Sequence, residues 1–322
     1  MLARVADSLY WMNRYLERTE FSARLVSLQV QRLPVGSAAE IAKGWQLLFA
    51  GLGADPSEFV PPGSLEDDDY LFADGYTLTD LLTFETGNPA SMLNCMTAAR
   101  ENAREVRSSI GPRIWSSLNR EYLALRRTRL VDVWKREPEL LYRDIAEGIE
   151  RFHGVCDTSM RHGEEWCFMQ LGKYVERAQL VGSLLAAHCG EGSAYAHGDA
   201  EWPVLLRSCN AFEAYGHEYG GAFEEGNVLQ LLVHEPELPF SLRFCLERLH
   251  SGLSVIDPAP PGESRPPPFA ILHRLDDLFD RYAESSADNE PPDSRSLGPI
   301  RLQFREFHDA LERSYVYYPV NA

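Results

Sequence analysis

The stretch LARVADSLYWMNRYLERTEFSARLVSLQV, residues 2–30, decides the fold class. Its apolar side chains recur at alternating steps of three and four residues, which is the spacing of one face of an α-helix. The pattern predicts a helix of about eight turns that is suited to a helical bundle. The positions of this apolar face are Leu2, Val5, Leu9, Met12, Leu16, Ala23, Val26 and Val30, with Thr19 in the remaining place.

A polar flank lies beside this apolar face. Side chains three, four and seven positions apart are neighbours on a helix, and this flank contains Tyr10, Asn13, Glu17 and Arg24. Charges next to core positions must be paired or hydrated, so the flank favours an internal polar network or a charged cleft. A purely structural ion pair is an equal alternative at this stage.

The Glu-Arg pair of this helix occurs a second time. Tyr15-Leu16-Glu17-Arg18 is matched by Tyr174-Val175-Glu176-Arg177, 159 positions later and close to half the chain. The match is short, and it leaves open whether the bundle is duplicated.

A second long helix is predicted from about residue 89 to 126, with a break at Gly111-Pro112. Beside its apolar face, three arginines and two glutamates lie within eight positions. Arginine presents a planar fork that matches carboxylate and phosphate groups, so this segment is a candidate anion-binding site. A solvated charged face is the alternative. The five residues are Arg100, Glu101, Arg104, Glu105 and Arg107.

The remaining sequence also favours helices, and almost none of it alternates as a strand does. The expected helices cover about 38–52, 76–86, 128–154, 161–189, 200–216, 226–233, 239–254, 268–284 and 298–316. Segments rich in proline and polar residues at 51–75, 257–268 and 284–298 are expected to be surface loops or connectors. None of them marks a domain boundary, so we expect one all-α, multi-helix domain over residues 1–322.

Composition excludes several classes of protein. The net charge of −17 over 322 residues argues against general nucleic-acid binding, which needs a basic surface. No apolar run reaches the length of about 20 residues that spans a bilayer, and no signal peptide is recognisable. The six cysteines show no Cys-x-x-Cys spacing, so reduced core thiols and a cytoplasmic location are expected.

Several motifs together resemble the alpha-E domain family, a bacterial family of helical domains. The resemblance begins with Arg4-Val5-Ala6-Asp7-Ser8-Leu9-Tyr10-Trp11 and Arg14-Tyr15-Leu16-Glu17-Arg18. It continues through residues 99–107, Trp115 with Asn119, Trp166, Gly172, Glu176-Arg177-Ala178, Glu213 with Tyr215, and Pro239 with Ser241-Leu242-Arg243-Phe244. The family pattern has an acidic residue two positions before the tryptophan, where this chain has Arg113.

The resemblance implies a context rather than a known reaction. Members of this family accompany circularly permuted ATP-grasp ligases and often a transglutaminase-like peptidase. The chain has neither of the common glycine-rich nucleotide motifs, so we expect no cofactor here and assign no catalytic residue. The leading hypothesis is an accessory subunit that binds the ligase, or an acidic peptide or amino-acid substrate. Its expected binding residues are Arg14, Glu17, Arg18, Arg100, Glu101, Arg104, Glu176 and Arg177.

An alternative hypothesis is a ferritin-like dimetal carboxylate enzyme. Two Glu-x-x-His pairs, Glu150 with His153 and Glu247 with His250, have the spacing of the ligand pairs in such bundles. Glu17 and Glu101 would complete the ligand set. The composition predicts about one such pair by chance, so the motif alone carries little weight.

Overall fold

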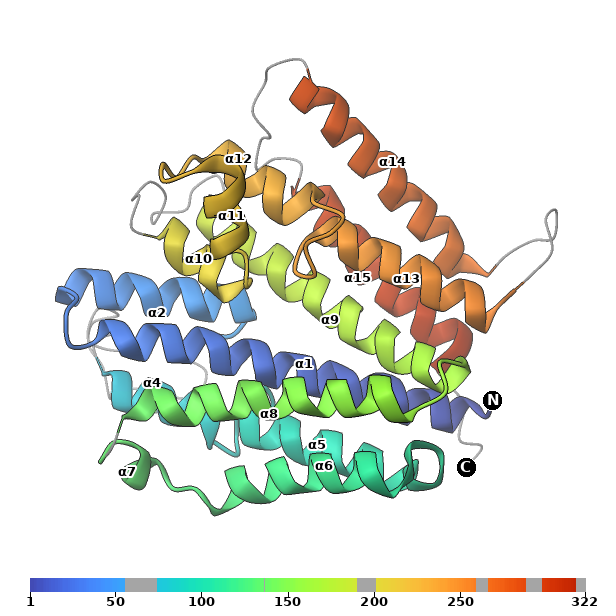
Figure 1. Ribbon diagram of the computed structural model, residues 1–322, viewed down its shortest axis with the longest axis horizontal. Coiled ribbons are helices and arrows are strands. Elements are labelled where there is room, and N and C mark those ends of the chain that lie inside the picture. The colour runs from blue at the N-terminus through green and yellow to red at the C-terminus, as the bar shows by residue number, and fades with distance from the viewer. Residues whose placement is uncertain (56–73, 136, 190–200, 259–265, 288–296, 317–322) are drawn as a thin grey trace. The chain divides into compact units, whose positions relative to one another are not determined.

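The computed structural model describes residues 1–55, 74–135, 137–189, 201–258, 266–287 and 297–316, and every element in these ranges is helical (Figure 1). The all-α, multi-helix prediction is therefore confirmed. The chain divides into two compact units. Unit 1 contains residues 1–14 and 161–322, and unit 2 contains residues 15–160. The helix α1 (Ala3–Arg32) contributes its first residues to unit 1 and the rest to unit 2.

The helix α1 is buried on more than its apolar face. Leu9 and Leu16 of the predicted apolar face are fully buried, and so are Tyr10 and Glu17 of the polar flank. Leu2 is 73% exposed, because the helix begins only at Ala3. The buried flank means that its charged side chains need partners inside the protein.

The described part of unit 2 contains six more helices. They are α2 (Ala38–Leu52), α4 (Gly75–Thr83), α5 (Met92–Glu105), α6 (Arg107–Arg127), α7 (Leu130–Val133) and α8 (Pro138–Ser159). The long helix α6 packs against both α5 and α8, and Figure 1 shows the three lying side by side. Ser37 and Glu40 form a capping box at the start of α2, which satisfies backbone N–H groups that have no helical partner.

The second predicted helix is interrupted twice. α5 ends at Glu105, and α6 contains Gly111 with φ of 76°, a left-handed conformation that favours glycine. The expected break at Gly111-Pro112 is therefore present, and the chain also turns at Val106.

Unit 1 is built on the long helix α9 (Glu164–Cys189). α9 packs against α13 (Leu242–Ile256) and α15 (Leu297–Leu311), and α14 (Pro267–Ala287) contacts both of these helices. The shorter elements are α10 (Trp202–Ser208), α11 (Phe212–Tyr219), α12 (Glu225–Leu229) and the π-helical turns η2 (Gln230–His234) and η4 (Glu312–Val316). α9 and α13 lie along each other in Figure 1.

Two predicted helices are divided in the structure. The segment 200–216 forms α10 and α11, separated at Asn210, whose φ is 49°. The segment 128–154 forms the short α7 and then α8. Glu137 is extended before Pro138, because proline disfavours a helical conformation in the residue that precedes it.

The predicted connectors fall between helices. Residues 56–73, 259–265 and 288–296, which make up most of these segments, lie outside the described residues. At their edges α2 reaches Leu52, α14 starts at Pro267 and reaches Ala287, and α15 starts at Leu297. All six cysteines are buried thiols. In the described part of the chain, the helices are too short or too polar to cross a membrane.

Candidate functional site

The centre of unit 1 is a buried ion pair between the two predicted motifs. Arg14 of α1 and Glu176 of α9 are 6% and 1% exposed. The Arg14 Nε and Nη2 atoms lie 2.7 and 2.6 Å from the same carboxylate oxygen, Oε2 of Glu176. The sequence predicted both residues as site residues, and the packing of the helices brings them together across 162 positions.

Three further polar side chains complete this centre. Arg14 Nη2 donates to Oε1 of Gln179 at 3.0 Å, and Nη1 lies 2.8 Å from Nε2 of His308. The hydroxyl of Tyr10 lies 2.8 Å from Nδ1 of His308. The guanidinium also stands over the Trp11 ring, 4.7 Å from its centroid.

Burial and charge set the ionisation of this centre. Burial, reinforced by the positive charge of Arg14, lowers the pKa of His308 to about 3, so its imidazole is neutral and accepts a hydrogen bond from Arg14. Burial raises the pKa of Tyr10. Burial alone would lower the pKa of Arg14, but the adjacent Glu176 carboxylate raises it above its ordinary value. The centre therefore holds one cation and one anion among neutral groups.

Unit 1 is expected to lose stability as the pH falls below about 6.5. The pKa of His308 falls from 6.5 to about 3 on folding, and burial, with the charge of Arg243, lowers that of His234 to about 4. Between these values the unfolded chain binds protons that the folded chain does not, so acid favours unfolding. The slope is at most about 1.4 kcal/mol per pH unit for each histidine. Thermal unfolding followed from pH 7 to 4 measures this slope, and His308→Gln should make it shallower. An unchanged slope in that variant would contradict the assignment.

Arg177, the second residue of the Glu-Arg motif, does not join this centre in the contacts described and packs against the segment before α13. It is 4% exposed and donates from Nη1 to the backbone carbonyl of Pro239 at 3.0 Å. Its guanidinium lies 3.9 Å from the centroid of the Phe240 ring. Arg177 thus fixes the turn before α13, where the hydroxyl of Ser241 accepts from the N–H of Phe244. Its contacts here are structural ones.

Unit 2 contains a similar set of side chains. Glu17 and Glu20 of α1 and His153 of α8 are all buried, and one ligand atom from each lies within 4.8 Å of the others. Glu20 forms an ion pair with Arg24. Arg18 is the second residue of the motif, and it donates to the backbone carbonyl of Leu52 at 3.4 Å.

The two sets occupy equivalent helix positions. Glu17 and Glu20 are three residues apart on one helix, as are Glu176 and Gln179, and each set includes a histidine from the last long helix of its unit. Sequence reasoning missed Glu20, Gln179 and His308. The first two could have been found by extending the alignment of the two motifs by two residues. No local pattern marks His308, because its place depends on the packing of α15.

Only some of the residues of the dimetal alternative lie close together in the structure. In the pair Glu150 and His153, the glutamate is exposed and the histidine is buried. In the other pair Glu247 is exposed, and Nε2 of His250 lies 2.9 Å from a carboxylate oxygen of Asp276. Among the described residues, the one group of at least three such side chains close enough to share a metal ion is Glu17, Glu20 and His153. Metal binding stays a prediction.

The predicted arginine cluster of α5 lies at the surface of unit 2. Glu101 accepts from Nη1 of Arg100 at 2.8 Å and pairs with Nη2 of Arg104 at 2.7 Å. Nε of Arg100 donates to Oδ1 of Asn119 at 2.8 Å. The guanidinium groups of Arg100 and Arg107 both stand over Trp115, 5.4 and 5.3 Å from its ring centroid. The tryptophan therefore holds two cations in place at the start of α6.

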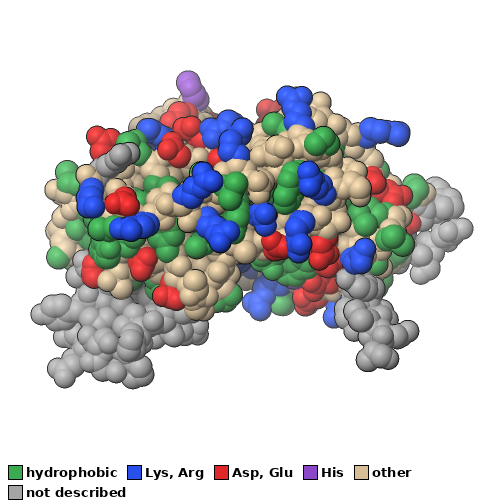
Figure 2. Space-filling model, turned by 90° about the horizontal axis from the view of Figure 1, so that it is seen from below, with side chains coloured by type: hydrophobic (Ala, Val, Ile, Leu, Met, Phe, Trp, Pro, Cys, Tyr) green, Lys and Arg blue, Asp and Glu red, His purple; other side chains and the backbone are tan. Residues whose placement is uncertain are grey.

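This cluster is one part of a larger basic surface. Residues 100–129 contain eight arginines and three glutamates, in a chain whose net charge is −17. We call these eight side chains the arginine surface. Figure 2 views the molecule from the side on which α6 and α7 lie in Figure 1, and basic side chains gather there. The eight side chains of the arginine surface are those of Arg100, Arg104, Arg107, Arg113, Arg120, Arg126, Arg127 and Arg129.

Half of the arginine surface is not neutralised. Arg107, Arg113, Arg126 and Arg127 are exposed and have no ion pair with any described residue. By contrast, the predicted residues Arg14, Glu17, Glu176 and Arg177 are all buried. Glu101 and Arg104, whose side chains are 44% and 63% exposed, are the predicted residues most open to a partner.

Comparison with known proteins gives the family of the chain. Uncharacterised proteins of Mycobacterium bovis and Mycobacterium tuberculosis are 28% identical to it over 275 residues, which is 82% of this chain and 31% of each relative. The chain thus spans about a third of the length of these relatives. No solved structure matches. The model of the Alpha-E family, described as a predicted alpha-helical domain with a conserved ER motif, matches residues 1–316. The chain therefore belongs to the Alpha-E family.

Proposed function

We propose that this chain is an accessory subunit of an ATP-grasp-dependent amide-ligation or peptide-modification system. In this proposal the arginine surface of unit 2 binds an acidic region of the ligase. The observation that carries the proposal is the local excess of arginine over glutamate between residues 100 and 129, in a chain that is otherwise strongly acidic. A surface of one sign steers a partner of the opposite sign and sets the binding orientation.

The chemistry of the arginine surface supports an acidic partner. Carboxylates are bound bidentately by the guanidinium fork, and for four of the arginines no carboxylate of the described residues competes with a partner. Trp115 fixes the orientation of Arg100 and Arg107, which lowers the entropy lost on binding. The buried Arg14 and Glu176 would then stabilise unit 1 and would not contact the partner.

Charge reversal on the arginine surface is expected to prevent binding. The variant Arg104→Glu/Arg107→Glu/Arg113→Glu should lose co-purification with the ATP-grasp protein, while its far-UV circular dichroism stays unchanged. Each reversal replaces attraction with like-charge repulsion, and the expected loss of affinity is at least about tenfold per residue. Binding by the unaltered chain should also weaken as salt rises, because the screening length falls below about 10 Å above 0.1 M ionic strength.

The matched control is Arg161→Glu, which reverses an exposed arginine of unit 1 and should bind as the unaltered chain does. A transglutaminase-like protein is the second bait for the same assay. Equal binding by the triple variant and the control would overturn the arginine surface as the docking site. If the chain changed the ATP turnover of the ligase on an acidic peptide but formed no stable complex with the ligase, the arginine surface would bind the substrate and not the ligase.

A further inference from the structure

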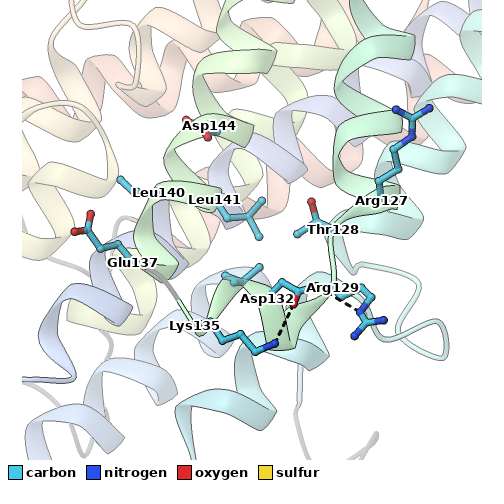
Figure 3. Close-up of a pocket in the computed structure, with 10 residues that line it drawn as sticks. Arg127, Thr128, Arg129, Asp132, Lys135, Glu137, Leu140, Leu141 and Asp144 are labelled. Atoms are coloured by element: carbon cyan, nitrogen blue, oxygen red, sulfur yellow. Dashed lines mark hydrogen bonds and ion pairs between the residues drawn. The ribbon is translucent and has the colours of Figure 1, made fainter.

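A cavity opens in unit 2 at the end of the arginine surface. It has a volume of about 590 Å³ and lies between the C-terminal end of α6, α7 and the first turns of α8 (Figure 3). A second cavity of about 160 Å³ shares Thr128, Leu141 and Asp144 with it, so the two adjoin. The larger volume falls within the range of about 300–1,000 Å³ that is usual for small-molecule sites.

The charges around this cavity divide into a group that is paired and a group that is not. Asp132 lies 3.5 Å from Nε of Arg129 and 3.3 Å from Nζ of Lys135, so its carboxylate is shared between two cations. Arg127, Glu137 and Asp144 also line the cavity, and none of these three side chains has an ion pair with any residue in the described ranges. Figure 3 shows Arg127 and Asp144 on opposite helices, with Thr128 and Leu141 between them.

The wall between these charges is apolar. Val133, Leu140 and Leu141 line the larger cavity, and the adjoining one adds the side chains of Leu125 and Ile145. A ligand that satisfies all three features has a carboxylate for the arginine fork, an ammonium group for the aspartate, and an apolar body. A purely anionic ligand would leave Glu137 and Asp144 as repelling neighbours.

We propose that this cavity binds a zwitterionic amino acid or short peptide with an apolar side chain. Arg127 binds the carboxylate, Asp144 binds the ammonium group, and the leucines of α8 contact the side chain. This inference deepens the proposed function and rests on it for its biological role, because it names the substrate class that would be presented to a ligase.

The test uses the purified full chain, L-leucine and the dipeptide L-leucyl-L-leucine, with binding measured by saturation-transfer NMR and titration. Two blocked probes separate the charges: N-acetyl-L-leucine keeps the carboxylate, and L-leucine amide keeps the ammonium group. Arg127→Gln should weaken the binding of N-acetyl-L-leucine about tenfold and leave L-leucine amide unaffected. Asp144→Asn should have the opposite pattern, and both variants should weaken L-leucine.

Two control variants remove charge from the same stretch of α8 without touching the cavity lining. Arg143→Gln and Glu147→Gln should bind every probe as the unaltered chain does, because neither side chain lines the cavity. The two side chains lie 3.9 Å apart, so each variant removes one partner of the same weak ion pair. Failure of both zwitterionic probes to bind would overturn the inference, as would equal binding of the blocked probes by Arg127→Gln and Asp144→Asn. Loss of the ligase complex in the charge-reversal variant tests the docking surface separately, because that variant leaves Arg127 and Asp144 in place.

Discussion

Replacement of Arg14 by alanine is expected to destabilise unit 1 by about 3–5 kcal/mol, because it leaves the carboxylate of Glu176 buried without its cation. The substitution also removes the hydrogen bonds to Gln179 and His308 and the stacking over Trp11. For a unit of this size, the expected fall in unfolding temperature is roughly 6–20 °C. Thermal unfolding followed by circular dichroism measures it.

Two further variants make this prediction specific. Arg104→Ala removes an arginine whose side chain is 63% exposed, and it should change stability by no more than about 0.5 kcal/mol. The double variant Arg14→Met/Glu176→Met replaces both charges with apolar groups of similar length, so it should be more stable than Arg14→Ala. If Arg14→Ala lowered the free energy of unfolding by less than about 1 kcal/mol, the ion pair would have to be hydrated and not buried.

Gly172→Ala is expected to be the second strongly destabilising change in unit 1. A Cβ atom at this position would lie 2.1 Å from the backbone carbonyl oxygen of Tyr10, much closer than two such atoms can approach. Because the obstacle is backbone, the first turns of α1 and the helix α9 would have to separate, which loosens the nearby Arg14 and Glu176 pair. We expect a loss of about 3 kcal/mol, measured by the same thermal unfolding.

The matched control is the same substitution in a helix that leaves room for the methyl group. Gly154 lies in α8, and a Cβ atom there would meet no neighbouring atom within 4 Å. Gly154→Ala should therefore stabilise the chain by about 0.5–1 kcal/mol, because alanine loses less conformational freedom than glycine in a helix. Equal effects of the two substitutions would show that the contact at Gly172 does not limit how closely α1 and α9 approach.

Local patterns predicted the helices better than their ends. The three-four spacing from Val5 to Val30 identified α1, because one face of a helix repeats every 3.6 residues wherever it packs. The ends of α8 and the division at Asn210 were missed. They depend on backbone conformation at single residues, which apolar spacing does not record.

The sequence left open whether the predicted binding residues lie together. Arg14, Glu176 and Arg177 were expected to bind a partner or substrate, as were the arginines of α5. Unit 1 buries the first three residues in contacts of its own, and Arg104 lies at the surface of unit 2. The cavity beside Arg127 and Asp144 had no signal in the sequence, because its walls come from the ends of three helices.

The sequence by itself determined that the chain is all-helical, that it has the motifs of the Alpha-E family, and that charged residues occupy helix faces next to the core. These properties follow from the identities and spacing of residues within a few turns of one another. Only the tertiary structure decided that Arg14 neutralises Glu176, that His308 completes their centre, and that four of the five arginines of α6 have no ion pair with any described residue. Residues separated by more than a hundred positions meet only when helices pack, and the same Glu-Arg spacing is compatible with a buried ion pair or with an exposed binding surface.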